Sequence, residues 1–207
     1  MAGTLDIHVL ELLAARLCHE LIGPIAAVNN GVEVLAEGDA DFAADAVQLV
    51  GDSARRAGAR LQFYRFAYGF ASRGGFSGPP PHELASGYFE ATRIACEYHD
   101  SARMLPLEWQ KLGCNLLLVG AEALPRGGSL SLRAGPSGPE LAVSGSAANL
   151  SPEVKAAIGL LCPVAELSAR TIQGYFTGLL ARALGCRLFS IVTEPERFRL
   201  ATAALAD

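Results

Sequence analysis

Two long helical periodicities, separated by one short turn, constrain the fold of this 207-residue chain more than any other feature. Over residues 6–37 apolar side chains recur at steps of three and four, the spacing that places side chains on one face of an α-helix. We expect this first helix to end at Gly38, because glycine readily adopts the left-handed conformation common just past a helix. The expected buried seam consists of Ile7, Leu10, Ala14, Leu17, Leu21, Val28, Val32 and Leu35.

A second helix is predicted after the turn at residues 38–41. Its apolar residues alternate steps of four and three, which makes a heptad pattern. Two such helices form an antiparallel hairpin, and a hairpin alone cannot cover both of its apolar stripes. We therefore expect a homodimer in which two hairpins make a four-helix bundle, since two-fold pairing buries a self-complementary surface. The heptad residues are Ala43, Val47, Val50, Ala54, Ala57, Leu61, Tyr64 and Tyr68.

A linker rich in glycine and proline, at residues 72–81, divides the chain, since such a composition supports neither helix nor strand. It predicts a helical-hairpin domain at residues 1–74 and a second domain at residues 79–207. In the second part the patterns predict helices at 82–92, 106–124, 151–160 and 169–184. Strands are predicted at 94–98, 129–133, 140–144, 187–193 and 197–203. Helices layered on a mostly antiparallel sheet make a C-terminal α/β sandwich, so the fold class is α+β.

The composition argues against binding to nucleic acid or insertion in a membrane. The formal net charge is −4, and 17 basic residues are scattered among 21 acidic ones, so the basic surface of a phosphate-backbone binder is missing. No apolar run approaches the roughly 20 residues that span a bilayer, and the N-terminus lacks an export signal. We expect a cytoplasmic protein.

The five cysteines are widely spaced and form no Cys-x-x-Cys pair. Neither a disulfide framework nor a zinc site is therefore indicated, and no metal site is predicted. We expect all five, Cys18 included, to be small buried apolar residues.

His19 is the strongest candidate for a functional residue. Glu20 follows it directly, and Pro24 comes five residues later. Because His19 lies two positions from both Leu17 and Leu21, roughly 200° around the helix from either, it should face outward. Its neighbours on that face are mostly small, so a large partner could reach the imidazole. Pro24 removes a helical hydrogen bond and should bend the axis one turn after the histidine.

The run His19-Glu20-Leu21-Ile22-Gly23-Pro24 resembles the H-box of histidine kinases. Residues 13–20, 53–69 and the turn at 123–128 resemble more closely the ChpT-type histidine phosphotransferases of bacterial phosphorelays. The resemblance extends to most of the chain. It implies an N-terminal hairpin that dimerises and a C-terminal domain that keeps the fold of a histidine-kinase ATP-binding domain without its ATP site.

The residues that a kinase uses for ATP are incomplete in this chain. Asn115 occupies the expected asparagine helix, but no second asparagine follows it. The loop at residues 143–149 carries no carboxylate for the adenine amine, and residues 173–180 keep only sparse glycines. Phosphoryl transfer from a nucleotide depends on such positioning and charge neutralisation. We expect no ATP binding and no cofactor.

The resemblance implies that His19 takes a phosphoryl group from an aspartate in the receiver domain of a hybrid histidine kinase and passes it to response regulators. A neutral imidazole has a free ring nitrogen near neutral pH. By the same resemblance Nε2 attacks, Glu20 orients the ring or holds the proton on Nδ1, and magnesium comes only with the receiver. The expected docking contacts are Arg16, Ile22, Gly23 and Ala26 on the first helix, with Arg55, Arg56 and Arg65 on the second adding positive charge.

Two alternatives remain open at this stage. One is a histidine kinase with a divergent ATP site, which tight magnesium-dependent ATP binding would favour. The other is a noncatalytic adaptor or inhibitor that docks a kinase or response regulator, with His19 incidental. Replacement of His19 by alanine separates the adaptor from the phosphotransferase, because only the phosphotransferase should lose its effect.

Overall fold

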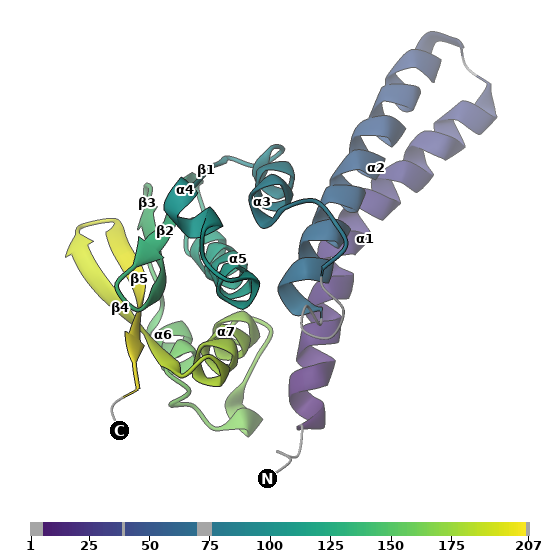
Figure 1. The fold of residues 1–207 in the computed structure, drawn as a ribbon. Helices are drawn as coiled ribbons and strands as arrows, with labels where there is room; N and C mark the ends of the chain where they lie inside the picture. The colour runs from purple at the N-terminus through teal and green to yellow at the C-terminus, as the bar shows by residue number, and fades with distance from the viewer. Residues whose placement is uncertain (1–5, 39, 70–75, 206–207) are drawn as a thin grey trace.

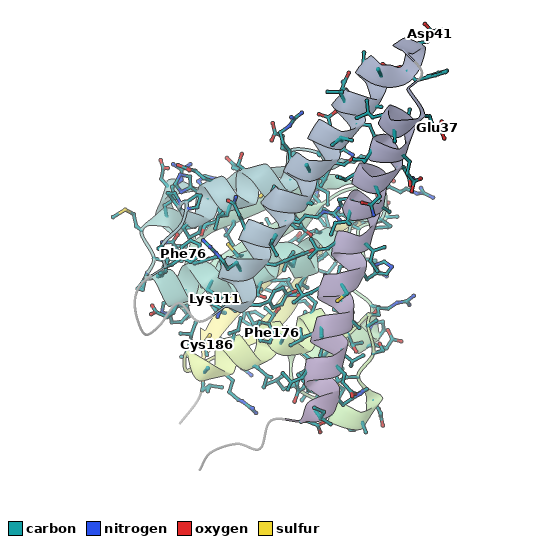
Figure 2. The ribbon with its side chains drawn as sticks, turned by 90° about the vertical axis from the view of Figure 1, so that its right-hand side faces the viewer. Glu37, Asp41, Phe76, Lys111, Phe176 and Cys186 are labelled. Carbon is teal, nitrogen blue, oxygen red and sulfur yellow. The ribbon has the colours of Figure 1, made fainter. Side chains whose placement is uncertain are left out.

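The computed structural model describes residues 6–38, 40–69 and 76–205 and has the predicted α+β fold (Figure 1). Two long antiparallel helices form a hairpin, and a five-stranded sheet with helices on one face follows. The two parts lie side by side at the base of the hairpin. The tip, marked by Glu37 and Asp41, lies far from the C-terminal domain (Figure 2). Within the described residues, no helix is both long and apolar enough to cross a bilayer.

The first helix, α1 (Ile7–Glu37), has the predicted bounds. The side chain of Asp6 caps it by accepting a hydrogen bond from the backbone N–H of His8, and Gly38 ends it with a φ of 75°. The helix continues through Pro24. The second helix, α2 (Ala40–Tyr68), completes the hairpin. Local signals at the ends of the first helix were therefore sufficient to place it.

The predicted buried seam of α1 is partly wrong. Ile7, Leu10, Ala14, Val32 and Leu35 are exposed, whereas Leu17, Leu21 and Val28 are half-buried. Periodicity identifies an apolar stripe but does not tell which side of the helix meets α2. In the structure α1 uses the neighbouring stripe, about a third of a turn away, for that contact. The part of this stripe that faces α2 contains Glu20, Pro24, Ala27, Gly31 and Val34. Nearer the N-terminus the same stripe continues through Val9, Leu13 and Arg16, which pack against the C-terminal domain.

The C-terminal domain has the predicted layers and a mostly antiparallel sheet. The strands lie in the order β1-β2-β3-β5-β4; β1 pairs with β2 in parallel, and the other pairs are antiparallel. They are β1 (Ile94–Tyr98), β2 (Gly128–Gly135), β3 (Gly138–Ser144), β4 (Cys186–Glu194) and β5 (Arg197–Ala204). The helices are α3 (Pro81–Phe89), α4 (Asp100–Arg103), α5 (Leu107–Glu122), α6 (Pro152–Ile158) and α7 (Ile172–Ala183), with a short 3₁₀ turn, η1 (Val164–Glu166).

The differences from the predicted elements are small and have local causes. Helix α4 and η1 were not predicted, because elements of three or four residues carry no readable periodicity. Helix α3 ends at Phe89 rather than at Thr92, whose hydroxyl donates to the Phe89 carbonyl at 2.8 Å. The predicted linker lies partly outside the described residues, and the domain boundary at residues 74–79 stays a prediction.

The base of the hairpin shares a hydrophobic core with the C-terminal domain. Phe63, Phe66 and Ala67 of α2 are almost fully buried in the same cluster as α5 and the inner face of the sheet. At the same place lies Phe176 of α7, which Figure 2 labels. Its ring centroid is 5.3 Å from that of Tyr68. The hairpin is thus packed onto the domain by apolar contacts as well as joined to it through the chain.

A buried polar network also joins the two parts. The guanidinium of Arg16 on α1 forms an ion pair with Glu122 on α5, and the Tyr68 hydroxyl donates to the side-chain oxygen of Gln173 on α7. Burial raises the pKa of Tyr68 to about 12, so this phenol stays protonated and able to donate at neutral pH. Gln173 in turn donates to Asn115 Oδ1 at 3.0 Å, and Asn115 donates to the carbonyl of Ala67 at 2.9 Å.

We predict that Gln173→Leu lowers the free energy of unfolding by about 2 kcal/mol, because it leaves buried partners without hydrogen bonds. Urea unfolding, with the midpoint compared at an unchanged slope, measures the change. Gln62→Leu on the exposed surface of α2 is the matched control and should shift the free energy of unfolding by no more than about 0.5 kcal/mol. Equal small shifts in both variants would contradict a structural role for the network.

Candidate functional site

His19 lies on the exposed surface of α1. Among the described residues it forms neither a hydrogen bond nor an ion pair. Counting roughly 100° per residue, it lies about 100° from the face that meets α2 and about 140° from the exposed apolar stripe. Its neighbours on this face include Ala15, Gly23 and Ala26, all exposed. The imidazole is therefore open to approach from solvent, as the sequence predicted.

Glu20 does not lie against the ring of His19. Its carboxylate pairs with Arg60 of α2, with Arg60 Nη1 at 3.2 Å from Glu20 Oε2, and the same nitrogen donates to the Glu20 backbone carbonyl at 2.7 Å. Consecutive helical side chains point about 100° apart, so the carboxylate turns toward α2 while the imidazole faces solvent. The expected hydrogen bond between Glu20 and the ring is absent from the described structure.

A hollow of about 340 Å³ between α1, α2 and α3 begins one helical turn from His19. Gly23 and Pro24 form one wall, Arg56 and Arg60 of α2 form a second, and α3 contributes Gly87, Tyr88 and the residues just beyond it. Gly23 has no atom within 4 Å of where a side chain would start, so this wall is open. The guanidinium of Arg56 makes the hollow suited to an anionic or acidic group, whereas that of Arg60 is already paired with Glu20.

The predicted docking residues differ in where they lie and in whether they already have a partner. Ile22 is 65% exposed and, like Gly23 and Ala26, lies close to His19 on α1. Arg56 is exposed and lines the hollow. Arg55 is also exposed but is paired with Asp52, and its position on the wheel turns it away from α1. Arg65 donates to the carbonyl of Ser77 at 2.9 Å, so its guanidinium is held at the segment before α3.

Arg16 is a correction to the prediction of an exposed docking contact. Only 12% of its side chain is exposed, and it is ion-paired with Glu122. It lies three residues before His19 but on the side of α1 that packs against α5. Burial raises the pKa of Glu122 while the guanidinium opposes that shift, as is usual for an acid enclosed with its counter-ion. Arg16 therefore holds α1 to the domain.

Cys18 is a second correction, since it is exposed rather than buried. It lines a shallow apolar groove on α1 together with Ile22, Ile25 and Ala26. Of the other cysteines, Cys114 and Cys186 are buried as predicted, and the remaining two are intermediate. Within the described part of the chain, His, Cys, Asp and Glu side chains form no group of three able to hold a metal ion.

Arg60 is the residue that sequence reasoning missed. Arginines recur through the second helix, and nothing in their spacing separates Arg60 from Arg55, Arg56 or Arg65. Pro24 did signal that the carbonyl four residues earlier would lack its helical donor. The identity of the replacement donor depends on how the two helices pair, which one helix alone does not reveal.

Comparisons with known proteins agree with this architecture. A family model described as the histidine phosphotransferase C-terminal domain matches residues 81–196. The chain is 36% identical over 183 residues to protein phosphotransferase ChpT of Brucella abortus (strain 2308), covering 86% of this chain and 87% of that protein. A solved structure titled as a bacterial phosphotransferase at 1.7 Å superposes with a TM-score of 0.80 and 35% identity, covering 97% of this chain and 98% of the other. The chain belongs to the histidine phosphotransferase family, and it is a phosphotransferase.

Proposed function

We propose that His19 is the phosphorylated residue of a bacterial two-component phosphorelay. It accepts a phosphoryl group from the aspartyl phosphate of one receiver domain and passes it to the aspartate of another. The observation that carries this proposal is an exposed imidazole that is engaged by no other described side chain and lies one turn from a hollow lined by the exposed Arg56.

The chemical step needs little from this chain beyond position. The Nε2 lone pair attacks phosphorus, the P–O bond to the receiver aspartate breaks, and the aspartate leaves as a carboxylate while Nδ1 keeps its proton. Transfer onward reverses these bonds with a second aspartate. Positioning and charge stabilisation are the main protein contributions to phosphoryl transfer. The magnesium ion that neutralises the phosphoryl oxygens comes with the receiver, so this chain needs no metal or cofactor of its own.

The receiver docks, in this proposal, on the side of the hairpin that carries His19. Ile22, Gly23 and Ala26 offer small or apolar contacts beside the histidine, and Arg56 offers a positive charge to the acidic pocket of a receiver. The donor is the receiver domain of a hybrid histidine kinase, and the acceptors are response regulators. Arg55 lies at the margin of this surface and contributes less, since it is already paired with Asp52.

We further propose that the chain works without ATP. The amide of Asn115, the candidate magnesium ligand in a kinase, has 0% exposure and is hydrogen-bonded to Gln173, Ala67 and Lys111. A magnesium ion could bind there only if this network opened. Glu122, the last residue of α5, is paired with Arg16. These contacts favour a structural role for Asn115 and Glu122 over the alternative of a divergent kinase that binds ATP.

A homodimer through the hairpin is the proposed assembly. Ile7, Leu10, Ile25, Val32 and Leu35 form an exposed apolar stripe on α1. Val47, Ala54 and Leu61 form a second one on α2. Successive helical residues point about 100° apart. Counted from the faces where α1 and α2 meet, both stripes lie on one side of the hairpin, away from His19. A second copy seated on them completes a four-helix bundle and leaves the histidine accessible.

The proposed location is the cytoplasm. Its support is the presence of five free cysteines in a phosphorelay protein, two of them buried, as expected where thiols stay reduced.

The test of the function uses a receiver phosphorylated on its aspartate as the sole phosphoryl donor. We expect the wild-type chain to take up one acid-labile phosphoryl group, mapped to His19. His19→Ala should lose transfer to background, because the attacking nitrogen is gone. His99→Ala, which removes an exposed histidine in the C-terminal domain, is the matched control and should transfer normally. Incubation with magnesium and ATP alone should leave the chain unlabelled.

Three results would contradict these proposals. Labelling of His19→Ala to the wild-type level would remove His19 from the mechanism. Labelling of the wild type by ATP alone would favour the divergent kinase. Full biological effect of His19→Ala without any transfer would favour the adaptor.

The dimer is tested with Val47→Glu combined with Leu61→Glu, residues that are 59% and 57% exposed in the single chain. Buried in a bundle, the two carboxylates should raise the dimer dissociation constant at least about 100-fold, because unpaired charges are costly in an apolar interface. Sedimentation equilibrium measures this constant. Gln48→Glu, an exposed position away from both stripes, is the control and should stay dimeric. A monomeric wild type would contradict the proposed assembly.

A further inference from the structure

Arg60 occupies the place of a hydrogen bond that Pro24 removes from α1. In an α-helix each backbone N–H donates to the carbonyl four residues earlier. Proline has no N–H, so the carbonyl of Glu20 lacks its helical donor. Arg60 Nη1, reaching across from α2, lies 2.7 Å from this carbonyl oxygen and donates to it.

The same guanidinium also holds the side chain of Glu20. Arg60 Nη1 lies 3.2 Å from Glu20 Oε2, so Arg60 binds one residue at both its backbone and its carboxylate. Both side chains are only about a third exposed, at 31% and 30%. An arginine at such a site is held more firmly than one in solvent, because its Nη1 donates to two fixed acceptors in a partly dry environment.

This contact lies in the helical turn that carries His19. Glu20 is the next residue, and Pro24 lies on the same turn as Gly23 at the wall of the hollow. A helix is most easily bent where a hydrogen bond is missing, so the donor that replaces it decides the local direction of the axis. Arg60 thereby sets where the imidazole lies relative to α2 and to Arg56.

The contact with Arg60 also offsets the negative charge of Glu20, the residue beside the histidine. An unpaired Glu20 carboxylate would put a negative charge one residue from His19, and negative charge opposes the approach of phosphoryl oxygens. Paired with Arg60, its charge is offset, and the ring nitrogens of His19 are left to the partner. The two effects, on backbone position and on charge, come from one side chain.

We infer that Arg60 is a positioning residue for phosphoryl transfer, acting on His19 through the Glu20 carbonyl that Pro24 leaves unpaired. The inference rests on the proposed role of His19. It adds a residue from the second helix, whose function is to hold the first helix in place at Pro24.

A double-mutant cycle tests this. Arg60→Met should lower the maximal rate of transfer from a phosphorylated receiver by roughly 10- to 100-fold, the range expected for a misplaced reacting group. The KM for the receiver should change by less than about 3-fold, since the docking surface is kept. Pro24→Ala restores a backbone N–H to the Glu20 carbonyl. In that background Arg60→Met should lower the rate by only about 3-fold, the part due to the unpaired Glu20 charge, because the carbonyl then has its own donor.

Two further variants serve as controls for the double-mutant cycle. Arg103→Met removes an ion-paired arginine on α4, remote from the hairpin, and should leave the rate unchanged. Arg60→Lys keeps the charge and, lacking the planar fork, holds the two oxygens less well, so its rate should lie between wild type and Arg60→Met. If Arg60→Met loses helical circular dichroism, the rate of Arg60→Lys provides the test instead.

The outcomes separate this inference from the proposed function. An equal loss of rate from Arg60→Met in the wild-type chain and in the Pro24→Ala chain would overturn it, because Arg60 would then act only through its charge. A normal rate in all Arg60 variants of a chain that is labelled at His19 would overturn it as well. A wild-type chain that is never labelled at His19 would instead overturn the proposed function on which it rests.

Discussion

The packing of α1 against α2 decides what every other face of α1 can do. The helix meets α2 through a stripe of mixed residues that includes Glu20, Pro24 and the buried Gly31. Gly31 allows a close approach, since a side chain there would start 2.6 Å from a methyl group of Val50 and 3.2 Å from the carbonyl oxygen of Ala46. With that face used, an apolar stripe remains on one side and His19 on the other. One helix thus serves the hairpin, a proposed dimer and a proposed reaction without the three surfaces overlapping.

The C-terminal domain supports this arrangement instead of standing apart from it. Its core continues into Phe63 and Phe66 of α2, and the polar chain of Tyr68, Gln173 and Asn115 crosses the same boundary. Buried polar groups of this kind are costly unless each has a partner, so once satisfied they specify one relative placement. The amide of Asn115, for which the resemblance to kinases suggested a magnesium ion, is used here for hydrogen bonds between secondary-structure elements. In this molecule the domain holds the base of the hairpin in place, and the proposed catalysis lies on α1.

A proline in a helix is usually discussed as a defect, and here its effect is local. Pro24 frees one carbonyl, and the helix nevertheless runs from Ile7 to Glu37, with a side chain from α2 in the place of the missing donor. Glu20, the acid next to His19, is held by the same contact with Arg60. Its carboxylate therefore does not approach the ring, contrary to what the resemblance to the H-box implied. Helix geometry and helix pairing together explain the departure.

The sequence by itself determined the bounds of α1, the hairpin turn, the order of the main strands and helices, and the exposure of His19. All of these depend on residues close together in the chain: caps, glycines, prolines and the phase of a single helix. Only the tertiary structure decided that the neighbouring stripe of α1 meets α2, that Arg16 is paired with Glu122, and that Glu20 is held by Arg60. Arg16 and Glu122 are more than a hundred residues apart, and Glu20 and Arg60 lie on different helices. Which charges meet across such separations depends on the rotation and spacing of packed elements, and periodicity within one helix carries no information about either.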